Sequence, residues 1–459
     1  MPSPAARKAH HPLRRLSGRL LVLGAAAVIA ACGGNGYDDD GCSQPAQKDW
    51  VGSFMNDWYF WYRLSPRPNP GSFADALDYY DALLYTGTDP AFPADRFSRS
   101  ESTESFNRFF GDGATMGYGV AVNGFEVQAG QPLYVRYVEP ASDAAVKGVV
   151  RGDEVVSANG RTAAELIVAN DYSVLTAANA GDRLTLQLRR NGVTHTVVVE
   201  AKVHNLTPVS GARVVSTPNG RLMGYLMVKD MVAQADAGLD SAFALFRSQN
   251  VQDLVVDLRY NGGGLVSIGG ALASYIAGTR GFSGATPRTY AALLYNDKRA
   301  AANNQNFRFE SRGNALGLAR VYVLAGPRTA SASEQVINGL LGVGVQVVTV
   351  GDTTFGKPVG SLPAGYCGTT YSAVNFESTN ALNQGRFFDG FDATCPVPED
   401  FTRATGAVDD PLLVSAAHHA DNGACPALVA SSKPALTRAE KTAKRRAWTL
   451  DEREAMVPR

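Results

Sequence analysis

Residues 321–334 read Val-Tyr-Val-Leu-Ala-Gly-Pro-Arg-Thr-Ala-Ser-Ala-Ser-Glu, and this stretch says most about the fold. Its apolar beginning predicts a buried strand, and the small residues that follow predict a tight turn. A helix is expected next, because Val336, Ile337, Leu340 and Leu341 recur at the spacing of one helical face. A strand that leads through a short turn into a helix is typical of α/β proteins.

Three more apolar runs of the buried-strand type occur at 225–228, 254–258 and 345–350. Helical patterns follow three of the four runs, so we expect an α/β domain over residues 206–430. The chain has 459 residues, too many for one typical domain core, and further domains are therefore expected.

Two other regions precede this domain. Residues 46–104 are rich in aromatic side chains at helical spacing, with a second helix expected from Ser72, and they predict a small helical N-terminal unit. Residues 105–205 contain short β-like runs and turn pairs such as Asn159-Gly160, which predict a compact β-rich domain. Its expected strands are Tyr118–Val122, Leu133–Val138, Glu154–Ser157, Leu184–Arg189 and Val193–Val199.

The first 31 residues have the pattern of an export signal peptide. A basic stretch ends at Arg19, and the apolar run 20–31 is too short for a permanent membrane span. The residues around Cys32 resemble a bacterial lipobox, which implies cleavage before Cys32, lipidation of its thiol and a lipidated spacer over 32–45. The chain would then be an exported lipoprotein anchored to a membrane at the periplasmic face of the cell envelope, and Gly33 favours the outer membrane. An ordinary signal peptide with a coincidental cysteine is the alternative.

Charge argues against a nucleic-acid partner. The chain has 43 basic and 43 acidic residues, and five of the basic ones lie in the export signal, which leaves 38 basic residues in the remainder. The basic cluster at 441–446 belongs to residues 431–459, which we expect to be a basic tail, either a surface helix or disordered.

Besides Cys32, the chain contains Cys42, Cys367, Cys395 and Cys425, an even number that suits two disulfides in an exported protein. Three pairings are possible, and we favour Cys367–Cys395 because both residues flank one extended stretch. No Cys-x-x-Cys pair is present, so no metal site is expected.

Two segments of the β-rich domain resemble a PDZ domain. The first is Gly117-Tyr118-Gly119-Val120 at the start of a strand, and the second is 140–146, which leads into the turn at 151–153. In PDZ domains the first segment is a loop whose N–H groups hold a carboxylate, while the peptide adds to the next strand. A Gly-x-Gly alone would indicate only a tight turn. The resemblance implies that these four residues bind the C-terminus of a protein or peptide.

Three expected strand ends carry residue types that suit hydrolysis. Residues 255–264 run from a strand into a glycine-rich loop, whose N–H groups suit a developing oxyanion, although the glycines can also serve the backbone dihedrals alone. Ser331 precedes a helix, where free amides favour negative charge. With Glu334 three residues later it also has the pattern of a capping box, the better interpretation of that segment by itself. Lys357 follows the strand 345–350 and can act as a base only if burial lowers its pKa.

Together, the Thr-Ala-Ser-Ala-Ser-Glu and Phe-Gly-Lys motifs resemble the carboxyl-terminal processing (tail-specific) protease family, from Asp95-Arg96-Phe97-Ser98 to Asp409-Asp410-Pro411. The resemblance implies a crotonase-like α/β catalytic core with a PDZ domain. It implies Ser331 as nucleophile, with Ser333 as the fallback, and Lys357, 26 residues after Ser331, as general base. The N–H groups of Gly263 and Ala332 would be the oxyanion donors. The family often has a glutamine four residues after the lysine, and here Ser361 stands there as a candidate third catalytic residue.

These inferences predict a serine endopeptidase of the cell envelope that needs no metal or cofactor. The alternative is a non-catalytic lipoprotein that only binds peptides, which the departure at Ser361 favours and the intact Ser331 and Lys357 oppose. A penicillin-recognising enzyme fits less well, because no lysine stands three residues after Ser331 or Ser333. An enoyl-CoA hydratase-type enzyme shares the core fold but suits neither the PDZ domain nor the lipobox. The oligomeric state stays open.

Overall fold

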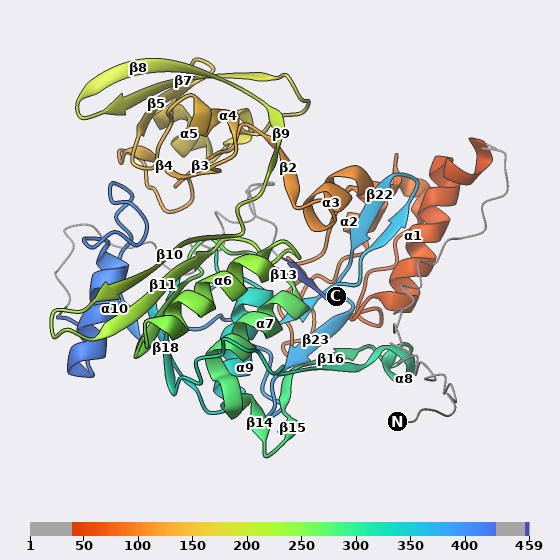
Figure 1. Cartoon of the computed structure of the whole chain (residues 1–459). Coiled ribbons are helices and arrows are strands. Elements are labelled where there is room, and N and C mark those ends of the chain that lie inside the picture. Colours follow the sequence, from red (N-terminus) through yellow and green to blue (C-terminus); the bar gives the residue numbers. More distant parts are fainter. Residues whose placement is uncertain (1–38, 428–454, 459) are drawn as a thin grey trace, which may run out of the picture. The chain divides into compact units, whose positions relative to one another are not determined.

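The computed structural model describes residues 39–427 and 455–458 (Figure 1). The expected signal peptide, the lipidation site at Cys32 and the first part of the spacer lie outside the described residues. The first described element is the 3-10 helix η1 (Asp39–Cys42).

A six-stranded sheet forms the centre of the expected α/β domain, in the order β10-β11-β12-β18-β19-β24. Only β10 is antiparallel to its neighbour, and the other strands are parallel. All four apolar runs expected as strands belong to this sheet. Its strands are β10 (Val209–Ser216), β11 (Leu222–Val228), β12 (Asp253–Asp257), β18 (Arg320–Ala325), β19 (Gln346–Gly351) and β24 (Cys395–Pro396).

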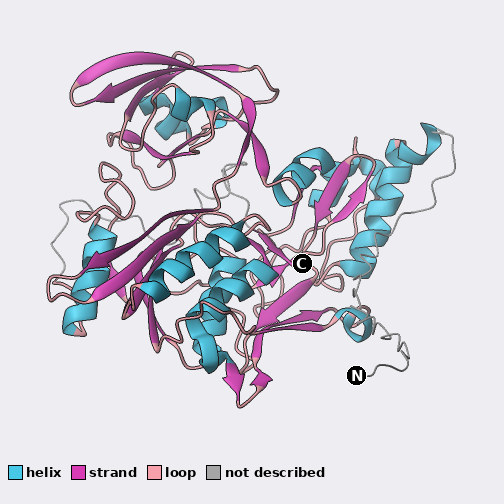
Figure 2. Cartoon of the chain, viewed as in Figure 1, coloured by secondary structure: helices cyan, strands magenta, loops and turns pink. Residues whose placement is uncertain are grey.

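Side chains alternate between the two faces of this sheet, and each face has its own apolar core. On β18, Val321 and Val323 belong to the cluster that contains α6 (Ala235–Ser248), α7 (Val266–Ala277) and α9 (Ala332–Gly342). Tyr322 and Leu324 belong instead to the cluster of α10 (Pro411–Asn422). Helices therefore cover both faces (Figures 1 and 2). Because the carboxyl ends of parallel strands meet at one edge of a sheet, the loops after β12, β18 and β19 come together there.

Shorter elements extend this domain. A second sheet has the order β17-β16-β23-β20, and its strand β20 follows the loop that carries Lys357. A two-residue hairpin, β14-β15, lies beyond α7. The bounds are β13 (Gly263–Leu265), η4 (Gly278–Gly281), β14 (Phe282–Ser283), β15 (Thr286–Pro287), β16 (Thr289–Tyr295), α8 (Ala300–Asn303), β17 (Gln305–Arg308), β20 (Val359–Gly360) and β23 (Phe376–Thr379).

The N-terminal unit is helical but shares its core with the α/β domain. Its aromatic cluster includes Ala330, Phe355 and Tyr371 from that domain. The second helix starts at Ala76 rather than Ser72, because the Asp75 carboxylate accepts the N–H groups of the first helical turn, each at 2.9 Å. The elements are α1 (Gln44–Trp58), η2 (Pro70–Ser72), α2 (Ala76–Ala82), β1 (Arg99–Ser102) and α3 (Thr103–Phe110), and β1 joins β22 (Thr369–Ser372) and β21 (Ala364–Tyr366) in a three-stranded sheet.

The middle domain is β-rich, as expected, and has its own apolar core. The main path of its sheet runs β3-β4-β5-β7-β8, with β6 paired to β5, and β2 and β9 form a separate pair that leads in and out. Asn159 and Asn191 have φ values of 45° and 50°, as the Asn-Gly turns require. The elements are β2 (Ala114–Gly117), β3 (Val120–Val122), β4 (Leu133–Val138), α4 (Asp143–Val146), β5 (Glu154–Ala158), β6 (Arg161–Thr162), α5 (Ala163–Ala169), η3 (Ser173–Leu175), β7 (Arg183–Arg190), β8 (Val193–Glu200) and β9 (Lys202–Asn205).

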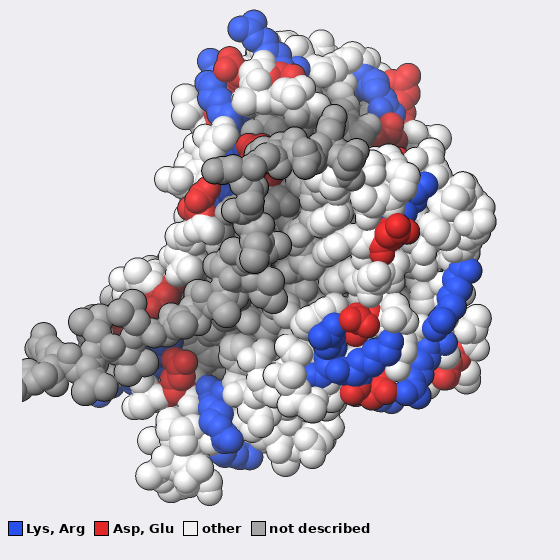
Figure 3. All heavy atoms as spheres, turned by 90° about the vertical axis from the view of Figure 1, so that its right-hand side faces the viewer, with Lys and Arg blue, Asp and Glu red and all other residues white. Residues whose placement is uncertain are grey.

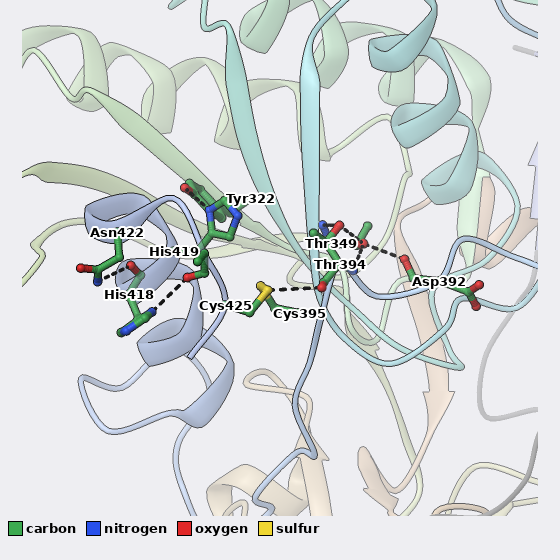
Figure 4. Close-up of a disulfide and its surroundings, with 10 residues drawn as sticks. Tyr322, Thr349, Asp392, Thr394, Cys395, His418, His419, Asn422 and Cys425 are labelled. Carbon is green, nitrogen blue, oxygen red and sulfur yellow. Dashed lines mark hydrogen bonds between the residues drawn. A yellow bond between two sulfur atoms is a disulfide. The ribbon is translucent and has the colours of Figure 1, made fainter. Parts of the chain in front are cut away.

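Two disulfides form, but the predicted pairing Cys367–Cys395 is wrong. The bridges are Cys42–Cys367 and Cys395–Cys425, with Cα–Cα distances of 5.6 and 5.4 Å, within the range that a disulfide requires. Cys367 lies in the turn between β21 and β22, which packs beside the N-terminal unit, whereas Cys395 lies on the central sheet near the end of α10 (Figure 4). The extended stretch between them joins two different sheets, so flanking it does not bring them together.

The expectation of a tail without packed structure over 431–459 is wrong for residues 455–457. These residues form β25 (Ala455–Val457), which is buried and pairs in parallel with β13. The apolar Ala455, Met456 and Val457 complete a core that the basic composition of the region obscured.

No helix among the described residues is both long and apolar enough to cross a membrane. On the face drawn in Figure 3, basic and acidic side chains lie beside one another in small groups.

Candidate active site

Ser331 lies in the turn between β18 and α9, with φ 62° and ψ −118°. This is the conformation of the first central residue of a type II′ turn, which glycine favours and other residues rarely adopt. The side chain is completely buried, and among the described residues its hydroxyl has no hydrogen-bond partner. A strained backbone that presents an unsatisfied buried hydroxyl suggests a functional role.

Ser331 stands at the N-cap of α9 with the geometry of a capping box, but its hydroxyl makes no capping hydrogen bond. Ser331 and Glu334 occupy the two positions of a capping box, and the Glu334 carboxylate accepts the Ser331 N–H at 2.9 Å. The Ser331 hydroxyl, however, caps no amide of α9. The Ser331 hydroxyl oxygen therefore accepts no hydrogen bond from the helix and is available to react.

Glu334 joins the serine loop to the lysine loop. Its Oε2 accepts the N–H groups of both Ser331 (2.9 Å) and Lys357 (2.8 Å), so these two nitrogens can be no farther apart than those two distances together. Its Oε1 accepts the Thr354 hydroxyl at 2.5 Å and the Gly356 N–H at 2.6 Å. Burial raises the pKa of Glu334, and these four hydrogen bonds act in the opposite direction.

Lys357 is buried, with 3% of the residue exposed, and its Nζ donates to the Phe97 carbonyl at 3.2 Å. Phe97 belongs to the Asp95-Arg96-Phe97-Ser98 element of the N-terminal unit. Within this element the Asp95 carboxylate accepts the N–H groups of Phe97 (2.8 Å) and Ser98 (3.0 Å). Arg96 donates to three carbonyls, those of Phe355 (3.1 Å), Gly356 (3.4 Å) and Phe388 (3.4 Å). The element 95–98 thus holds the lysine loop through contacts other than those of Glu334. No local sequence pattern predicted this role.

Asn261 organises the glycine-rich loop. Its Oδ1 accepts the Gly263 N–H at 2.8 Å, and its backbone carbonyl accepts the Ala330 N–H at 3.1 Å. The Gly263 N–H is therefore engaged in this conformation, which gives no support to its predicted role as an oxyanion donor. Ala332 is the first residue of α9, so its N–H has no acceptor within the helix. That amide fits the predicted oxyanion site better.

Two other predicted hydroxyls are committed elsewhere. The Ser333 hydroxyl donates to the Asn261 carbonyl at 3.0 Å, which makes it a structural group and a poor fallback nucleophile. The Ser361 hydroxyl donates to the Ser372 carbonyl at 3.1 Å. This bond commits the hydroxyl proton of the candidate third catalytic residue to a main-chain carbonyl, and its predicted role beside Lys357 stays a prediction.

The predicted peptide-binding loop lies at the mouth of a large cavity. Gly117 ends β2, Val120 begins β3, and β3 is an edge strand of the middle-domain sheet. Gly119 has φ +78°, and a Cβ there would lie 2.0 Å from the Ser142 Cβ, so only glycine fits. The cavity, of about 830 Å³, is lined by residues 117–121 and also by Gly262 of the glycine-rich loop. The cavity therefore reaches from the edge strand to the start of the glycine-rich loop, while Ser331 and Lys357 do not line it.

Potential metal ligands gather in the described residues at Cys395, His419 and Cys425. Both sulfurs are consumed in a disulfide, and the His419 ring lies 3.2 Å from the Tyr322 hydroxyl (Figure 4). The cluster is structural, because a metal site needs free thiolates.

Comparison with known proteins agrees with this geometry. Residues 222–384 match the model of peptidase family S41, and residues 46–99 match the model of the peptidase S41 N-terminal domain. The first region contains Ser331 and Lys357, and the second contains the element 95–98, whose Phe97 carbonyl contacts Lys357.

Relatives of known sequence are C-terminal processing peptidases. A chloroplastic carboxyl-terminal-processing peptidase 3 from Arabidopsis thaliana is 29% identical over 287 residues, which cover 60% of this chain and 51% of that one. A chloroplastic C-terminal processing peptidase from Tetradesmus obliquus is 27% identical over 259 residues, which cover 53% and 52%. The chain thus spans about half the length of these relatives. A solved structure of a protein from Bacteroides fragilis assigned to the S41 proteases has a TM-score of 0.63 and 25% identity, covering 82% of this chain and 97% of the other.

Proposed function

Because residues 222–384 match the model of peptidase family S41 and residues 46–99 match that of its N-terminal domain, we propose that this chain is a serine-type endopeptidase that cleaves proteins with Ser331 as nucleophile and Lys357 as general base. The observation that carries the proposal is the shared Glu334 oxygen, which holds the backbone amides of both residues at one point. A buried hydroxyl without a partner and a buried amine, on two loops that one carboxylate oxygen joins, suit a Ser–Lys dyad.

In the mechanism, the neutral Lys357 amine turns from the Phe97 carbonyl to the Ser331 hydroxyl and takes its proton as Oγ attacks the substrate carbonyl. The Ala332 N–H stabilises the oxyanion of the tetrahedral intermediate. Collapse of the intermediate breaks the peptide bond, and Lys357 returns the proton to the leaving amine. Water, activated in turn by Lys357, hydrolyses the acyl-enzyme ester.

We assign substrate recognition to the middle domain, acting as a PDZ domain. The edge strand β3 can accept an added peptide strand, and the loop 117–120 offers backbone N–H groups to a terminal carboxylate. The cavity that this loop lines also reaches Gly262, next to the Gly263 that contacts Ala332, so a chain end bound at the loop would lie on the side of the catalytic loops. Substrates would therefore be unfolded or tagged proteins engaged through their C-termini.

We also propose that the mature protein is a lipoprotein anchored at Cys32 on the periplasmic face of the envelope. The lipobox-like sequence supports this assignment. Metabolic labelling with a fatty-acid analogue tests it: Cys32→Ser should lose the label, and a label retained by that variant would contradict it.

The dyad is tested with Ser331→Ala and its matched control Ser333→Ala, assayed on an unstructured protein. We expect Ser331→Ala to lose at least about 10³-fold in kcat and Ser333→Ala to retain activity in the fraction that folds. Labelling by a serine-reactive fluorophosphonate should require both Ser331 and Lys357. Equal turnover by wild type and Ser331→Ala would leave the peptide-binding lipoprotein as the better assignment.

A further inference from the structure

The strand β25 (Ala455–Val457) lies between two of the catalytic loops. On one side it pairs in parallel with β13, with Ala455 opposite Gly263 and Met456 opposite Gly264. The Ala455 N–H donates to the Gly262 carbonyl at 2.9 Å. On the other side the Ser361 N–H donates to the Met456 carbonyl at 3.0 Å. Hydrogen bonds therefore hold this segment from both the glycine-rich loop and the strand that follows Lys357.

The contact with the catalytic centre is close. A Cβ on Gly263 would lie 2.2 Å from the Ala455 carbonyl oxygen and 2.8 Å from the Ala332 nitrogen. The backbone of Gly263 thus touches both the segment and the residue after Ser331. A Cβ on Gly360 would lie 2.6 Å from the Met456 carbonyl oxygen. Glycine at 263 and 360 leaves room for one extended backbone beside the nucleophile.

The segment is as deeply buried as the core. Ala455, Met456 and Val457 are 5%, 1% and 3% exposed, and they belong to the same apolar cluster as Ala332 and Val336 of α9. An extended chain that adds a strand through its backbone and buries alternate apolar side chains is the usual way in which a groove binds a peptide.

We propose that residues 455–457 occupy the peptide-binding groove of the catalytic centre as an internal pseudosubstrate. This inference rests on the proposed function and adds two statements to it. The groove between β13 and β20 selects extended segments with a medium-sized apolar side chain at the position of Met456. A substrate must also displace residues 455–457, so this segment is a competitive inhibitor of its own enzyme.

The expected size of the effect follows from tethering. A segment linked to its own binding site has an effective concentration on the order of millimolar, well above the concentrations of substrates in most assays. Release of the segment should therefore lower KM, and raise kcat/KM, by about tenfold or more, with a smaller change in kcat.

Met456→Glu tests the proposal, because it places a charge in the buried position without altering the catalytic loops. Its matched control is Val408→Glu, at a residue that is 87% exposed. We expect kcat/KM for an unstructured protein to rise about tenfold in Met456→Glu and to stay unchanged in Val408→Glu. Unchanged kcat/KM in Met456→Glu, with hydrolysis that still requires Ser331, would overturn the pseudosubstrate while leaving the proposed function intact.

A binding assay keeps the proposal testable without catalysis. A fluorescein-labelled peptide of the sequence of residues 453–459 is titrated into the Ser331→Ala variant with and without Met456→Glu. The peptide should bind the double variant at least about tenfold more tightly, because its groove is vacant. Equal affinity for the two proteins would refute the inference, whether or not the chain hydrolyses peptide bonds.

Discussion

The Nζ atom of Lys357 donates to the backbone carbonyl of Phe97, 3.2 Å away, although 260 residues separate the two in the chain. The proposed base is thus oriented by a main-chain atom of the N-terminal unit. The position four residues after the lysine, where the family often has a glutamine, contributes a hydroxyl that points elsewhere. We propose that the Phe97 carbonyl takes the place of that glutamine, since a backbone carbonyl accepts a hydrogen bond from an amine as a side-chain amide oxygen does.

Arg96→Ala should impair catalysis without removing a catalytic group. The guanidinium fixes the Phe97 element through three carbonyls, and it stacks on the rings of Phe97 and Phe355, with centroid distances of 5.0 and 4.5 Å. Loss of these contacts frees the carbonyl that orients Lys357, so we expect kcat to fall about tenfold with KM nearly constant. Steady-state kinetics of Arg96→Ala and Arg96→Lys measure this, with partial recovery in the lysine variant. The matched control is Arg63→Ala, whose side chain is 70% exposed, and an equal fall in that variant would contradict the assignment.

Glu334→Gln should weaken the site and the fold together. The buried carboxylate accepts four hydrogen bonds, and an amide replaces one accepting oxygen by an NH₂ group that faces donors. We expect a loss of about 3 kcal/mol in the free energy of unfolding and at least about 10²-fold in kcat. Urea unfolding and turnover are measured on the same preparation. Glu104→Gln, at a side chain that is 79% exposed, is the control and should change stability by less than about 0.5 kcal/mol.

The ion pairs of Glu399, which join the middle domain to the α/β domain, should lose their contribution to stability in acid. Arg151 of the middle domain donates to Glu399 at 2.8 Å, and Arg259, beside the glycine-rich loop, lies 3.3 Å from the same carboxylate. Burial opposes ionisation of Glu399, but the two arginines outweigh it, and the pKa of Glu399 is lowered. A carboxylate whose pKa is lower in the folded than in the unfolded state stabilises the folded protein fully at pH values above its unfolded pKa, about 4.3. That contribution is lost as the pH falls from there through the folded-state pKa.

The matching measurement is thermal unfolding of wild type and Glu399→Gln between pH 7 and pH 3. The wild type should be more stable at pH 7, by about 3 kcal/mol, and the difference should shrink below about pH 4. Asp409→Asn serves as the control, since the Arg403–Asp409 pair is about half exposed on both sides. A difference between wild type and Glu399→Gln that is constant with pH would rule out the ion pair as its source.

The two disulfides should contribute unequally to stability. Cys42–Cys367 closes a loop of 325 residues, whereas Cys395–Cys425 closes one of 30. Loop-closure entropy predicts contributions of about 6 and about 3.5 kcal/mol. Differential scanning calorimetry of the two Cys→Ser double variants should therefore show the lower melting temperature for the variant that lacks Cys42–Cys367. The reverse order would contradict the loop-length argument and indicate that enthalpic differences in the folded state, rather than loop-closure entropy, set the difference.

Features that depend on neighbouring residues could be predicted from the sequence, whereas contacts between residues far apart in the chain could not. The strands β11, β12, β18 and β19 and the turn at Ser331 follow from local apolar runs and small residues, and the structure contains them. The contact between Lys357 and Phe97, the sharing of Glu334 Oε2 and the pairing of Cys42 with Cys367 depend on segments that meet only in the folded protein. Hydrophobic periodicity does not predict contacts between such distant segments. The sequence therefore shows the element 95–98 as a motif but not its contact with Lys357.

The strand at 455–457 and the missing hydrogen bond of the Ser331 hydroxyl are hidden from sequence analysis for another reason. The basic composition of residues 431–459 outweighed the short apolar triplet 455–457, which makes a strand only because β13 offers an unpaired edge. Ser331 and Glu334 have the spacing of a helix cap, and the spacing cannot reveal that only the glutamate makes its hydrogen bond.

The backbone of Ser331 carries a cost that only its chemistry explains. At φ 62° and ψ −118° the backbone conformational energy of a serine is higher than that of a glycine by on the order of 1–3 kcal/mol, and the packing of the surrounding core must offset this cost. Ser331→Gly should therefore give a more durable protein with no nucleophile, a variant that resists heat better as it ceases to work. If stability alone were selected, glycine would be favoured at position 331. A serine in this unfavourable backbone conformation therefore indicates selection for function.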